Sequence, residues 1–212
     1  MENNIFFHIA TMGNYQEVVD EISSKINDKF DNVFVGIVGD KKVNIPSHYK
    51  ILYQNDDVSN FEFLTLEHLQ SYCKGHICNV LYVHTKGITA EPQYKEAIDD
   101  WRKYMTYFLV EKNDKCIEYL NEYDICGVDW RGHPVNHFSG NFWWATSNHI
   151  NQLPDISQLK LPTSKVIITI RHNAEFWIGM KDNIKVKVLF DCGISQYERH
   201  LHAFKKEQYI IV

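Results

Sequence analysis

The sequence predicts an α/β fold in which a mostly parallel, mixed sheet is flanked by helices. Short apolar runs typical of buried strands alternate with segments in which apolar residues recur at helical spacing. In the first half these segments follow the order strand, helix, strand, strand, helix, strand, helix, which is typical of a parallel sheet covered by helices. The length of 212 residues and the hydrophobic fraction of 44% fit one large domain.

The first half of the chain alternates regularly between the two kinds of element. Val18, Val19, Ile22 and Ile26 recur at helical spacing, so they predict the apolar face of an amphipathic helix. The expected strands are Ile5–Met12, Val33–Val38, Lys50–Tyr53 and Val80–Val83, and the expected helices are Tyr15–Lys29 and Phe61–Cys73.

The second half is richer in loops. Pro92 suits the first turn of a long helix, because its missing N–H would be unpaired there in any case. The expected helices are Glu91–Lys112 and Asp114–Glu122, and the expected strands are Ile125–Val128, Phe142–Ala145, Val166–Ile170 and Lys185–Phe190. Open α/β sheets bind ligands at the carboxyl ends of their strands, so we expect a crevice at those ends in the first half.

Composition and charge exclude several classes of protein. The net charge is −5, which gives no general attraction to a phosphate backbone, so we expect no nucleic-acid partner. No run of about 18 apolar residues occurs, which argues against a transmembrane segment. The N-terminus lacks the features of a secretory signal, and the five cysteines contain no CxxC pair. These features favour a cytoplasmic protein with reduced thiols.

A polar cluster follows the fourth expected strand. His84, Thr85 and Lys86 can donate hydrogen bonds to anionic oxygens, and Gly87 permits close approach of a ligand to the backbone. This pattern predicts a phosphate-binding site. The alternative is a surface loop with a solvated lysine, and the cluster alone does not separate the two.

The segment from Ser139 to Trp144 combines a turn with two tryptophans. Ser139, Gly140 and Asn141 predict a tight polar turn. Trp143 and Trp144 are neighbours in an expected strand, so their side chains point to opposite faces. We expect one ring in the core and the other in a cleft, where it can stack on a sugar. The alternative places both rings in the core, but the polar lead-in favours a site.

The segment Arg171–Trp177 follows the expected strand Val166–Ile170, so its polar groups should lie at a strand end. Glu175 is a candidate general base, and Arg171 and His172 can orient its carboxylate. The alternative is a structural ion pair between Glu175 and Arg171.

Further polar positions lie in other elements. Asp129 ends an expected strand and could bind a sugar hydroxyl or a metal ion. Asp100 and Arg102 lie in the long expected helix. Neighbouring side chains of a helix point about 100° apart, so only some of the charged side chains of this segment can face a pocket. Asp56 and Asp57 follow the third strand and could hold a ribose or a nucleobase, although a solvated loop is equally consistent with them.

Several familiar motifs are absent from the sequence. It contains no GxGxxG, no P-loop, no GxSxG and no HExxH, so P-loop enzymes and dinucleotide oxidoreductases are unsupported. No Asp-x-Asp occurs either. His200 and His202 could form part of a metal-ligand set, although exposed histidines near a terminus are commoner.

Taken together, these segments resemble the nucleotide-sugar-dependent glycosyltransferases of the GT-A fold. Among these they are similar to the rhamnan-synthesis-F-like group and to related short transferases of bacterial and large-virus glycan clusters. The likeness rests on His84-Thr85-Lys86 after a strand, then Asp100-Trp101-Arg102, then Ser139 to Ala145, and it covers most of the chain. GT-A enzymes usually carry Asp-x-Asp after the fourth strand to hold Mn²⁺ or Mg²⁺, whereas this chain carries His84-Thr85-Lys86 there.

The resemblance implies one Rossmann-like GT-A domain over residues 1–212, with a nucleotide-binding half at 1–90 and an acceptor-side half at 91–212. Such an enzyme transfers a sugar from a UDP-, GDP- or dTDP-linked donor to a hydroxyl of a glycan acceptor, and we expect inversion. The implied catalytic residues are Glu175 as base and Asp129. The implied donor-binding residues are Thr11, Asp56, Asp57, His84, Thr85, Lys86, Asp100 and Arg102. The residues implied to contact the sugar or acceptor are Ser139, Gly140, Asn141, Trp143, Trp144 and His172.

The departure from Asp-x-Asp affects the expected metal dependence. A cationic side chain such as Lys86 can neutralise the leaving diphosphate in place of a metal ion. If Mn²⁺ or Mg²⁺ does bind, Asp129, His200 and His202 are the candidate ligands. Two other functions stay open, namely a degenerate GT-A domain that binds nucleotide or glycan without turnover, and a structural module of a glycan-synthesis complex.

Overall fold

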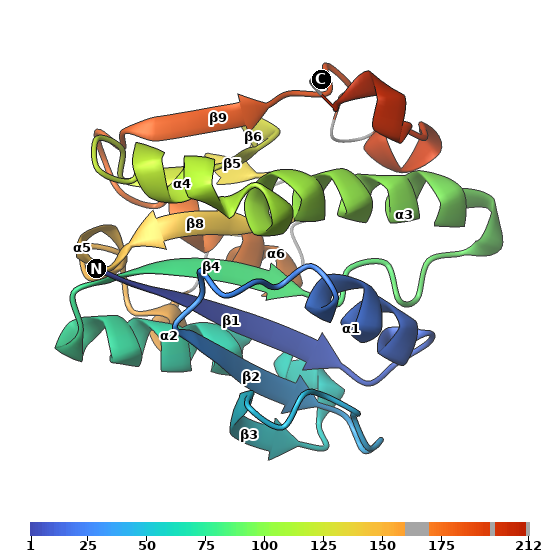
Figure 1. The fold of residues 1–212 in the computed structure, drawn as a ribbon, viewed down its shortest axis with the longest axis horizontal. Helices are drawn as coiled ribbons and strands as arrows, with labels where there is room; N and C mark the ends of the chain where they lie inside the picture. Colours follow the sequence, from blue (N-terminus) through green and yellow to red (C-terminus); the bar gives the residue numbers. More distant parts are fainter. Residues whose placement is uncertain (160–169, 196–197, 211–212) are drawn as a thin grey trace.

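The computed structural model describes residues 1–159, 170–195 and 198–210. It is built on a seven-stranded sheet with the strand order β3-β2-β1-β4-β8-β5-β9 (Figure 1). β8 runs antiparallel to both of its neighbours, and the other adjacent pairs are parallel. The expectation of a mostly parallel, mixed sheet is therefore confirmed.

The elements lie close to those expected from the sequence. The strands of the large sheet are β1 (Glu2–Ala10), β2 (Asn32–Val38), β3 (Lys50–Asn55), β4 (Cys78–His84), β5 (Ile125–Val128), β8 (Trp143–Thr146) and β9 (Val186–Phe190). A two-stranded sheet is formed by β6 (Trp130–Arg131) and β7 (His137–Phe138). The α-helices are α1 (Tyr15–Ser23), α2 (Phe63–Gly75), α3 (Pro92–Thr106), α4 (Asn113–Tyr119), α5 (Ser147–Ile150) and α6 (Ile170–Phe176).

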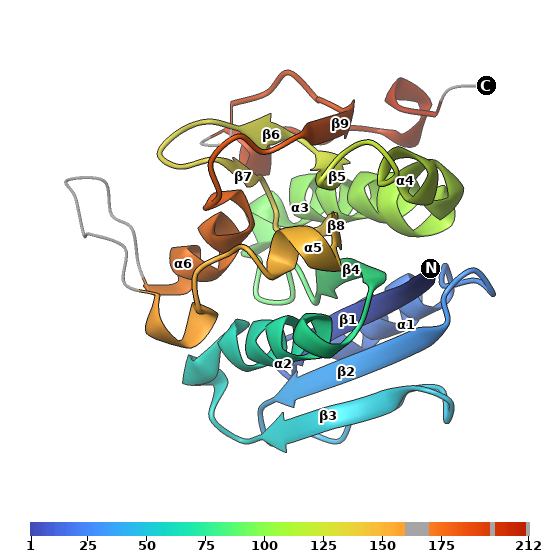
Figure 2. The ribbon, with the colours of Figure 1, turned by 90° about the vertical axis from the view of Figure 1, so that its left-hand side faces the viewer.

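Helices cover both faces of the sheet, as Figures 1 and 2 show. Buried residues of α1, α3 and α4 pack with one face of the sheet, and those of α2, α5 and α6 pack with the other. Along β1, Ile5 and Phe7 face the first layer, whereas Phe6 faces the second. The central strands are covered on both faces, which explains why their sequences are continuous runs of apolar residues.

The helices α1, α3 and α4 end earlier than the sequence predicts, α4 at Tyr119 instead of Glu122. α1 stops at Ser23 because the amides of Lys25 and Ile26 each donate to a carbonyl three residues back, which tightens the chain into turns. Ile26 still packs against the core. α3 stops at Thr106 and continues as a π-helical turn over Tyr107–Glu111, in which the amide of Lys112 donates to the carbonyl of Tyr107.

The segment around Glu175 differs from expectation. Of the expected strand Val166–Ile170, residues 166–169 lie outside the described residues, and Ile170 begins α6. Glu175 is therefore held by the last turn of a helix, and the expectation that the strand extends to Ile170 is wrong. The described residues contain no helix with the length and apolar composition needed to cross a membrane.

A buried arginine connects α3 to the neighbouring elements. The Nε and Nη2 of Arg102 donate to the two carboxylate oxygens of Glu21 on α1, at 3.1 and 2.8 Å. Its Nη1 donates to Asp99 and to the carbonyl of Lys86, both at 3.0 Å. One guanidinium thus fixes α1, α3 and the loop after β4 relative to one another.

We predict that Arg102→Leu lowers the free energy of unfolding by about 3 kcal/mol, because it leaves the partly buried carboxylate of Glu21 and the carbonyl of Lys86 without this donor and removes one of two cations paired with Asp99. Urea unfolding followed by circular dichroism measures this change. Lys103→Ala is the matched control on the same helix, because its ammonium lies 3.6 Å from Asp100 and is half exposed. Equal stability of the two variants would show that the Arg102 network contributes little.

Candidate functional site

A cavity of about 320 Å³ opens at the carboxyl ends of β1 and β4. The chain passes from β1 to β2 on one side of the sheet and later returns to β4 on the other, so the strand order reverses between β1 and β4. Ligands of open α/β sheets bind at such a reversal. The cavity is lined by His8, Ala10, Met12, Val38, Val58, Ser59, Phe61, Glu62, His84, Thr85, Gly87, Ile88, Thr89 and Arg171. The crevice therefore lies where the sequence predicts it.

One part of the cavity wall is apolar. Met12, Val58 and Phe61 line it, and their side chains are 41%, 38% and 37% exposed, so they rank among the most exposed large apolar residues described. Met12 follows β1, and the other two lie in the connection between β3 and α2. Such a rim can hold a flat apolar group such as a nucleobase.

A buried carboxylate also lines the cavity. Glu62 precedes α2, and its Oε2 accepts hydrogen bonds from the hydroxyl of Tyr82 at 2.9 Å and from Nδ2 of Asn141 at 2.5 Å. Its Oε1 lies 3.9 Å from Nδ1 of His84. Both donors hold the Glu62 side chain in place, because a carboxylate that accepts two hydrogen bonds has little freedom to rotate.

The peptide of Gly140 connects His84 to Glu175. Nε2 of His84 donates to the Gly140 carbonyl at 3.0 Å, and the Gly140 amide donates to Oε1 of Glu175 at 2.8 Å. The other oxygen of Glu175, Oε2, accepts no hydrogen bond from the described residues. Arg171 and Glu175 form no ion pair within the described part of α6, so the alternative of a structural pair finds no support there. The structure thus brings together three segments that the sequence analysis selected separately.

Only glycine suits this position in the turn. Gly140 has a φ of +98°, and the amide of Asn141 donates to the carbonyl of Phe138, which closes the expected tight turn. A Cβ on Gly140 would lie 2.7 Å from the sulfur of Met105 and 3.2 Å from the ring of Trp101. The backbone must therefore approach α3 closely for its peptide to reach both His84 and Glu175.

The histidines of the cavity are neutral. His8 and His84 are register partners on β1 and β4. Burial lowers the pKa of His8 to about 4, and burial, together with the charge of Lys86, lowers the pKa of His84 to about 3. Because the Gly140 carbonyl can only accept, the single proton of neutral His84 is on Nε2 and its Nδ1 carries a lone pair.

Lys86 lies beside the cavity but does not line it. Its ammonium packs over the ring of Trp101, 3.9 Å from the centroid. Burial lowers its pKa to about 8, while Glu175 opposes that shift. No carboxylate of the described residues lies within ion-pair distance of this ammonium, which leaves it able to bind an anion. Arg171 supplies a second cation on the cavity wall.

Several expected donor-binding residues have structural partners instead. Thr85 lines the cavity, but its hydroxyl accepts from the amide of Ala10 at 3.0 Å and so joins β4 to β1. Thr11 is buried, and its hydroxyl accepts from the amide of Lys41. Asp57 caps a short 3₁₀ turn by accepting from the amide of Ser59. These three side chains therefore hold the backbone around the cavity in position.

Other expected donor-binding residues point away from the cavity. Asp56 is exposed in the loop after β3 and is not part of the cavity lining. Asp100 lies on another side of α3, within 3.2 Å of the ammonium of Lys205. Arg102 is occupied by the carboxylates of Glu21 and Asp99. None of the three is among the cavity-lining residues, so their positions do not support contact with the donor there. For Asp100 and Arg102 the reason is that helical periodicity turns them to other surfaces of α3.

Both tryptophans of β8 are fully buried, so the expected sugar-stacking ring in a cleft is wrong. Trp143 packs on the α2 side of the sheet and Trp144 on the α3 side. Their ring nitrogens donate to the side chain of Asn141 and to the carbonyl of Leu109, both at 2.8 Å. The side chains do alternate as predicted, but helices cover both faces at this strand.

The remaining sugar-binding candidates lie around the same turn. Ser139 is buried, and its amide donates to the carbonyl of Asp129. Asn141 is buried behind Glu62, to which it donates. His172 lies on α6 with its ring stacked on Phe176, and it is not among the cavity-lining residues. Gly140 and Asn141 therefore support the site from behind its wall.

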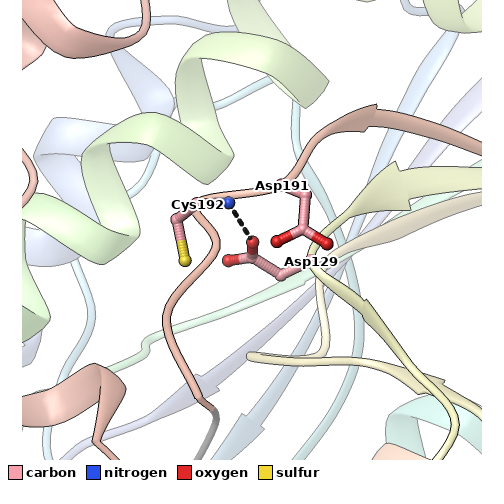
Figure 3. Close-up of side chains that lie close together, drawn as sticks. All are labelled: Asp129, Asp191 and Cys192. Carbon is pink, nitrogen blue, oxygen red and sulfur yellow. Dashed lines mark hydrogen bonds between the residues drawn. The ribbon is translucent and has the colours of Figure 1, made fainter.

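Asp129 belongs to a separate buried network. Its carboxylate accepts from the amide of Cys192 at 2.8 Å, as Figure 3 shows, and also from the hydroxyl of Tyr104. Nη2 of Arg131 lies 3.4 Å from it, and the same guanidinium pairs with Asp191 at 2.8 Å. Neither Asp129 nor Glu175 is among the cavity-lining residues, but Glu175 is connected to the lining residue His84 through Gly140, whereas the carboxylate of Asp129 is occupied by this separate network. A role of Asp129 as catalytic base is therefore not supported.

The network does not fit a divalent metal ion. Asp129, Asp191 and Cys192 offer ligand atoms within 4.8 Å of one another. However, a guanidinium already neutralises both carboxylates, and an amide and a hydroxyl occupy the lone pairs of Asp129. His200 packs against Tyr94, and His202 is exposed; neither belongs to this group. We therefore derive no step through Mn²⁺ or Mg²⁺.

Two residues that line the cavity, His8 and Glu62, are not selected by the sequence analysis. His8 lies inside an apolar run and Glu62 at the start of a helix, so neither stands at the end of a strand in the sequence. Arg171 was recognised only as a partner of Glu175. The signal that could have found His8 is a polar residue within an otherwise apolar strand, beside His84 in a parallel pair.

Comparison with known protein families gives one match. The model of a family described as a domain of unknown function (DUF8361) matches residues 4–189, which include every strand of the large sheet except the first residues of β1 and the last residue of β9. No curated protein matches the chain.

We predict that the protein loses stability as the pH falls from 6.5 toward 4. In the unfolded chain a histidine has a pKa near 6.5, whereas burial keeps the pKa of His8 and of His84 well below that value in the folded protein. Between pH 6.5 and pH 4 the unfolded state therefore binds more protons than the folded state, which favours unfolding. Each such group lowers the free energy of unfolding by up to about 1.4 kcal/mol per pH unit. Urea unfolding at several pH values measures the slope.

His84→Gln should make this slope shallower, because the amide keeps a donor for the Gly140 carbonyl but does not titrate. His48→Asn is the control, since His48 is exposed and distant from the cavity lining. A slope in His84→Gln equal to that of the wild type would mean that His84 titrates alike in the folded and unfolded states.

Proposed function

The chain belongs to the DUF8361 family, and we propose that it is a nucleotide-sugar-dependent glycosyltransferase with a GT-A fold. The observation that carries this proposal is the cavity at the β1–β4 reversal, which is lined by an apolar rim, by Arg171 and by the carboxylate of Glu62. Lys86 lies beside it, and Glu175 is connected to the lining residue His84 through the Gly140 peptide. A nucleoside diphosphate sugar has matching parts, namely a flat base, a diphosphate and a hydroxyl-bearing ring. The mixed sheet with reversed β8 is compatible with the proposed fold.

The cations fit the leaving group. As the bond between the anomeric carbon and the diphosphate oxygen breaks, its electron pair passes to the diphosphate. Lys86 and Arg171 are positioned to stabilise that charge, because the ammonium has no carboxylate partner among the described residues and the guanidinium lines the cavity. This role needs no metal ligand at His84-Thr85-Lys86.

Glu175 fits the base. Its Oε1 is fixed by the Gly140 amide, while its Oε2 can accept the proton of an acceptor hydroxyl. That hydroxyl oxygen would form the new bond to the anomeric carbon on the face opposite the diphosphate, which gives inversion. Burial lowers the pKa of Lys86 and of His84, and the negative charge of Glu175 raises both to a smaller extent. The latter effect supports a position of Glu175 close to the proposed diphosphate site.

The first test of the function is a binding and activity panel. UDP-, GDP- and dTDP-linked sugars are tested by thermal shift and by hydrolysis or transfer, with and without Mn²⁺. Binding together with turnover supports a transferase. Binding without turnover on any acceptor favours the degenerate, ligand-binding domain, and no stabilisation by any nucleotide contradicts the proposal.

We predict that Lys86→Ala weakens nucleoside diphosphate binding by roughly tenfold to a hundredfold, the cost of one charge-assisted hydrogen bond. Calorimetric titration with the preferred nucleotide measures the affinity. Because the pKa of Lys86 is about 8, wild-type affinity should also fall between pH 7 and pH 9, and the variant should lack this dependence. Lys112→Ala is the control, since Lys112 also lies over a ring, that of Tyr107, but away from the cavity. Unchanged affinity in Lys86→Ala would remove Lys86 from the donor site.

We predict that Glu175→Gln lowers kcat for sugar transfer by a factor of roughly 10² to 10⁴, the usual contribution of a general base. The amide oxygen of Gln can still accept from the Gly140 amide, so fold and nucleotide affinity should persist. Glu122→Gln, an exposed site, is the control. If kcat stays near the wild-type value, the residue is structural; if kcat, affinity and melting temperature fall together, it supports the fold rather than the reaction.

A further inference from the structure

Two hydrogen-bond acceptors face each other on the cavity wall without a donor between them. Oε1 of Glu62 and Nδ1 of His84 are 3.9 Å apart, and both residues line the cavity. Nδ1 carries a lone pair because the proton of the ring is used at Nε2 for the Gly140 carbonyl. Oε1 receives no hydrogen bond from any described residue, since both donors to Glu62 contact Oε2.

Both acceptors are held rigidly. The hydroxyl of Tyr82 and the amide of Asn141 fix the carboxylate, and the Gly140 carbonyl fixes the ring. The side chains of Glu62 and His84 are only 10% and 7% exposed. A ligand that supplies donors to both atoms therefore gains affinity without paying for their ordering.

We propose that Glu62 and His84 form a diol-binding pair, in which Oε1 and Nδ1 each accept a hydrogen bond from one of two adjacent hydroxyl groups of a sugar ring. This inference rests on the proposed function for the identity of the ligand, a nucleoside diphosphate sugar. The ring is either the ribose of the nucleoside or the sugar that is transferred. The chemistry is the same for both, and the experiment below separates them.

The surroundings favour neutral hydroxyl groups over other ligand groups at this pair. A phosphate would place its negative oxygens against the Glu62 carboxylate. An ammonium group would be attracted by the Glu62 carboxylate but repelled by Arg171, which lines the same cavity. A metal ion would find two ligand atoms here, because the described residues contain no third metal-ligating side chain grouped with them. Neutral hydroxyl groups, which donate without bringing charge, satisfy both acceptors.

Glu62→Gln tests the pair with little change of shape. Its amide oxygen can replace Oε2 and keep the hydrogen bonds from Tyr82 and Asn141. Its NH₂ group then occupies the position of Oε1, so an acceptor facing the cavity becomes a donor. His84→Gln is the second variant, which keeps a donor for the Gly140 carbonyl but removes Nδ1. Glu67→Gln is the control on α2, because Glu67 does not line the cavity.

The ligands are UDP, GDP, their 2′-deoxy counterparts, UDP-glucose and GDP-mannose, measured by calorimetric titration. Free ribose, glucose and mannose are measured at high concentration by saturation-transfer NMR. We expect Glu62→Gln to weaken binding of the ligand that carries the recognised diol by roughly tenfold to a hundredfold, the loss of a hydrogen bond to a charged acceptor. We expect His84→Gln to weaken the same ligand and Glu67→Gln to leave it unchanged.

The pattern of losses identifies the ring. If UDP or GDP loses affinity and its 2′-deoxy counterpart does not, the diol is that of the ribose. If only the nucleotide sugars lose affinity, the diol is that of the transferred sugar. Binding of free sugars that depends on Glu62, without binding of any nucleotide, supports the pair and contradicts the proposed glycosyltransferase. If neither variant changes the affinity of any ligand, or if no diol-bearing compound binds, the diol-binding pair is wrong.

Discussion

The parallel pairing of β1 with β4 determines where a ligand can enter this protein. Chain segments leave these two strands in opposite directions across the sheet, toward β2 on one side and toward α3 on the other, so their carboxyl ends stay uncovered. The same register places His8 beside His84, and the loop after β4 brings Thr85 and Gly87 into the cavity lining, with Lys86 beside it. Arg102 fixes that loop by binding the carbonyl of Lys86. The cavity is thus a consequence of strand order rather than of any single loop.

The site combines groups of opposite charge without letting them pair with one another. The carboxylates of Glu62 and Glu175 are held by neutral donors, namely Tyr82, Asn141 and the Gly140 amide. The ammonium of Lys86 is held by the face of a ring. None of these charged groups forms a close ion pair among the described residues. Each can therefore bind a group of a ligand. Such an arrangement suits a molecule that has both anionic and hydroxyl groups. The Gly140 peptide keeps the arrangement rigid, since it contacts His84 and Glu175 at once.

The buried Asp129 shows that a polar residue at the end of a strand need not take part in a binding site. It follows β5, as the sequence suggests, yet the loop after β9 folds over it and supplies the Cys192 amide, while Tyr104 approaches from α3. Its carboxylate therefore joins three elements of the core. Asp100 and Arg102 are similar, because the ion pairs that occupy them come from α1 and from the C-terminal segment. A charged residue finds a structural partner wherever distant segments meet it, and no local pattern reveals such a partner.

The sequence by itself determined the fold class, the order of the elements in the first half and the edge of the sheet at which the cavity lies. These features depend on the periodicity of apolar residues and on the rules of parallel sheets, which act locally. It also selected His84, Gly140, Asn141 and Glu175, although not the contacts among them. Only the tertiary structure decided that both tryptophans of β8 are buried, that Glu175 lies on a helix and that Glu62 faces His84. The physical reason is that burial and hydrogen bonding are set by which surfaces distant segments cover, and residues 62, 84, 140 and 175 meet only when the sheet and its helices are assembled.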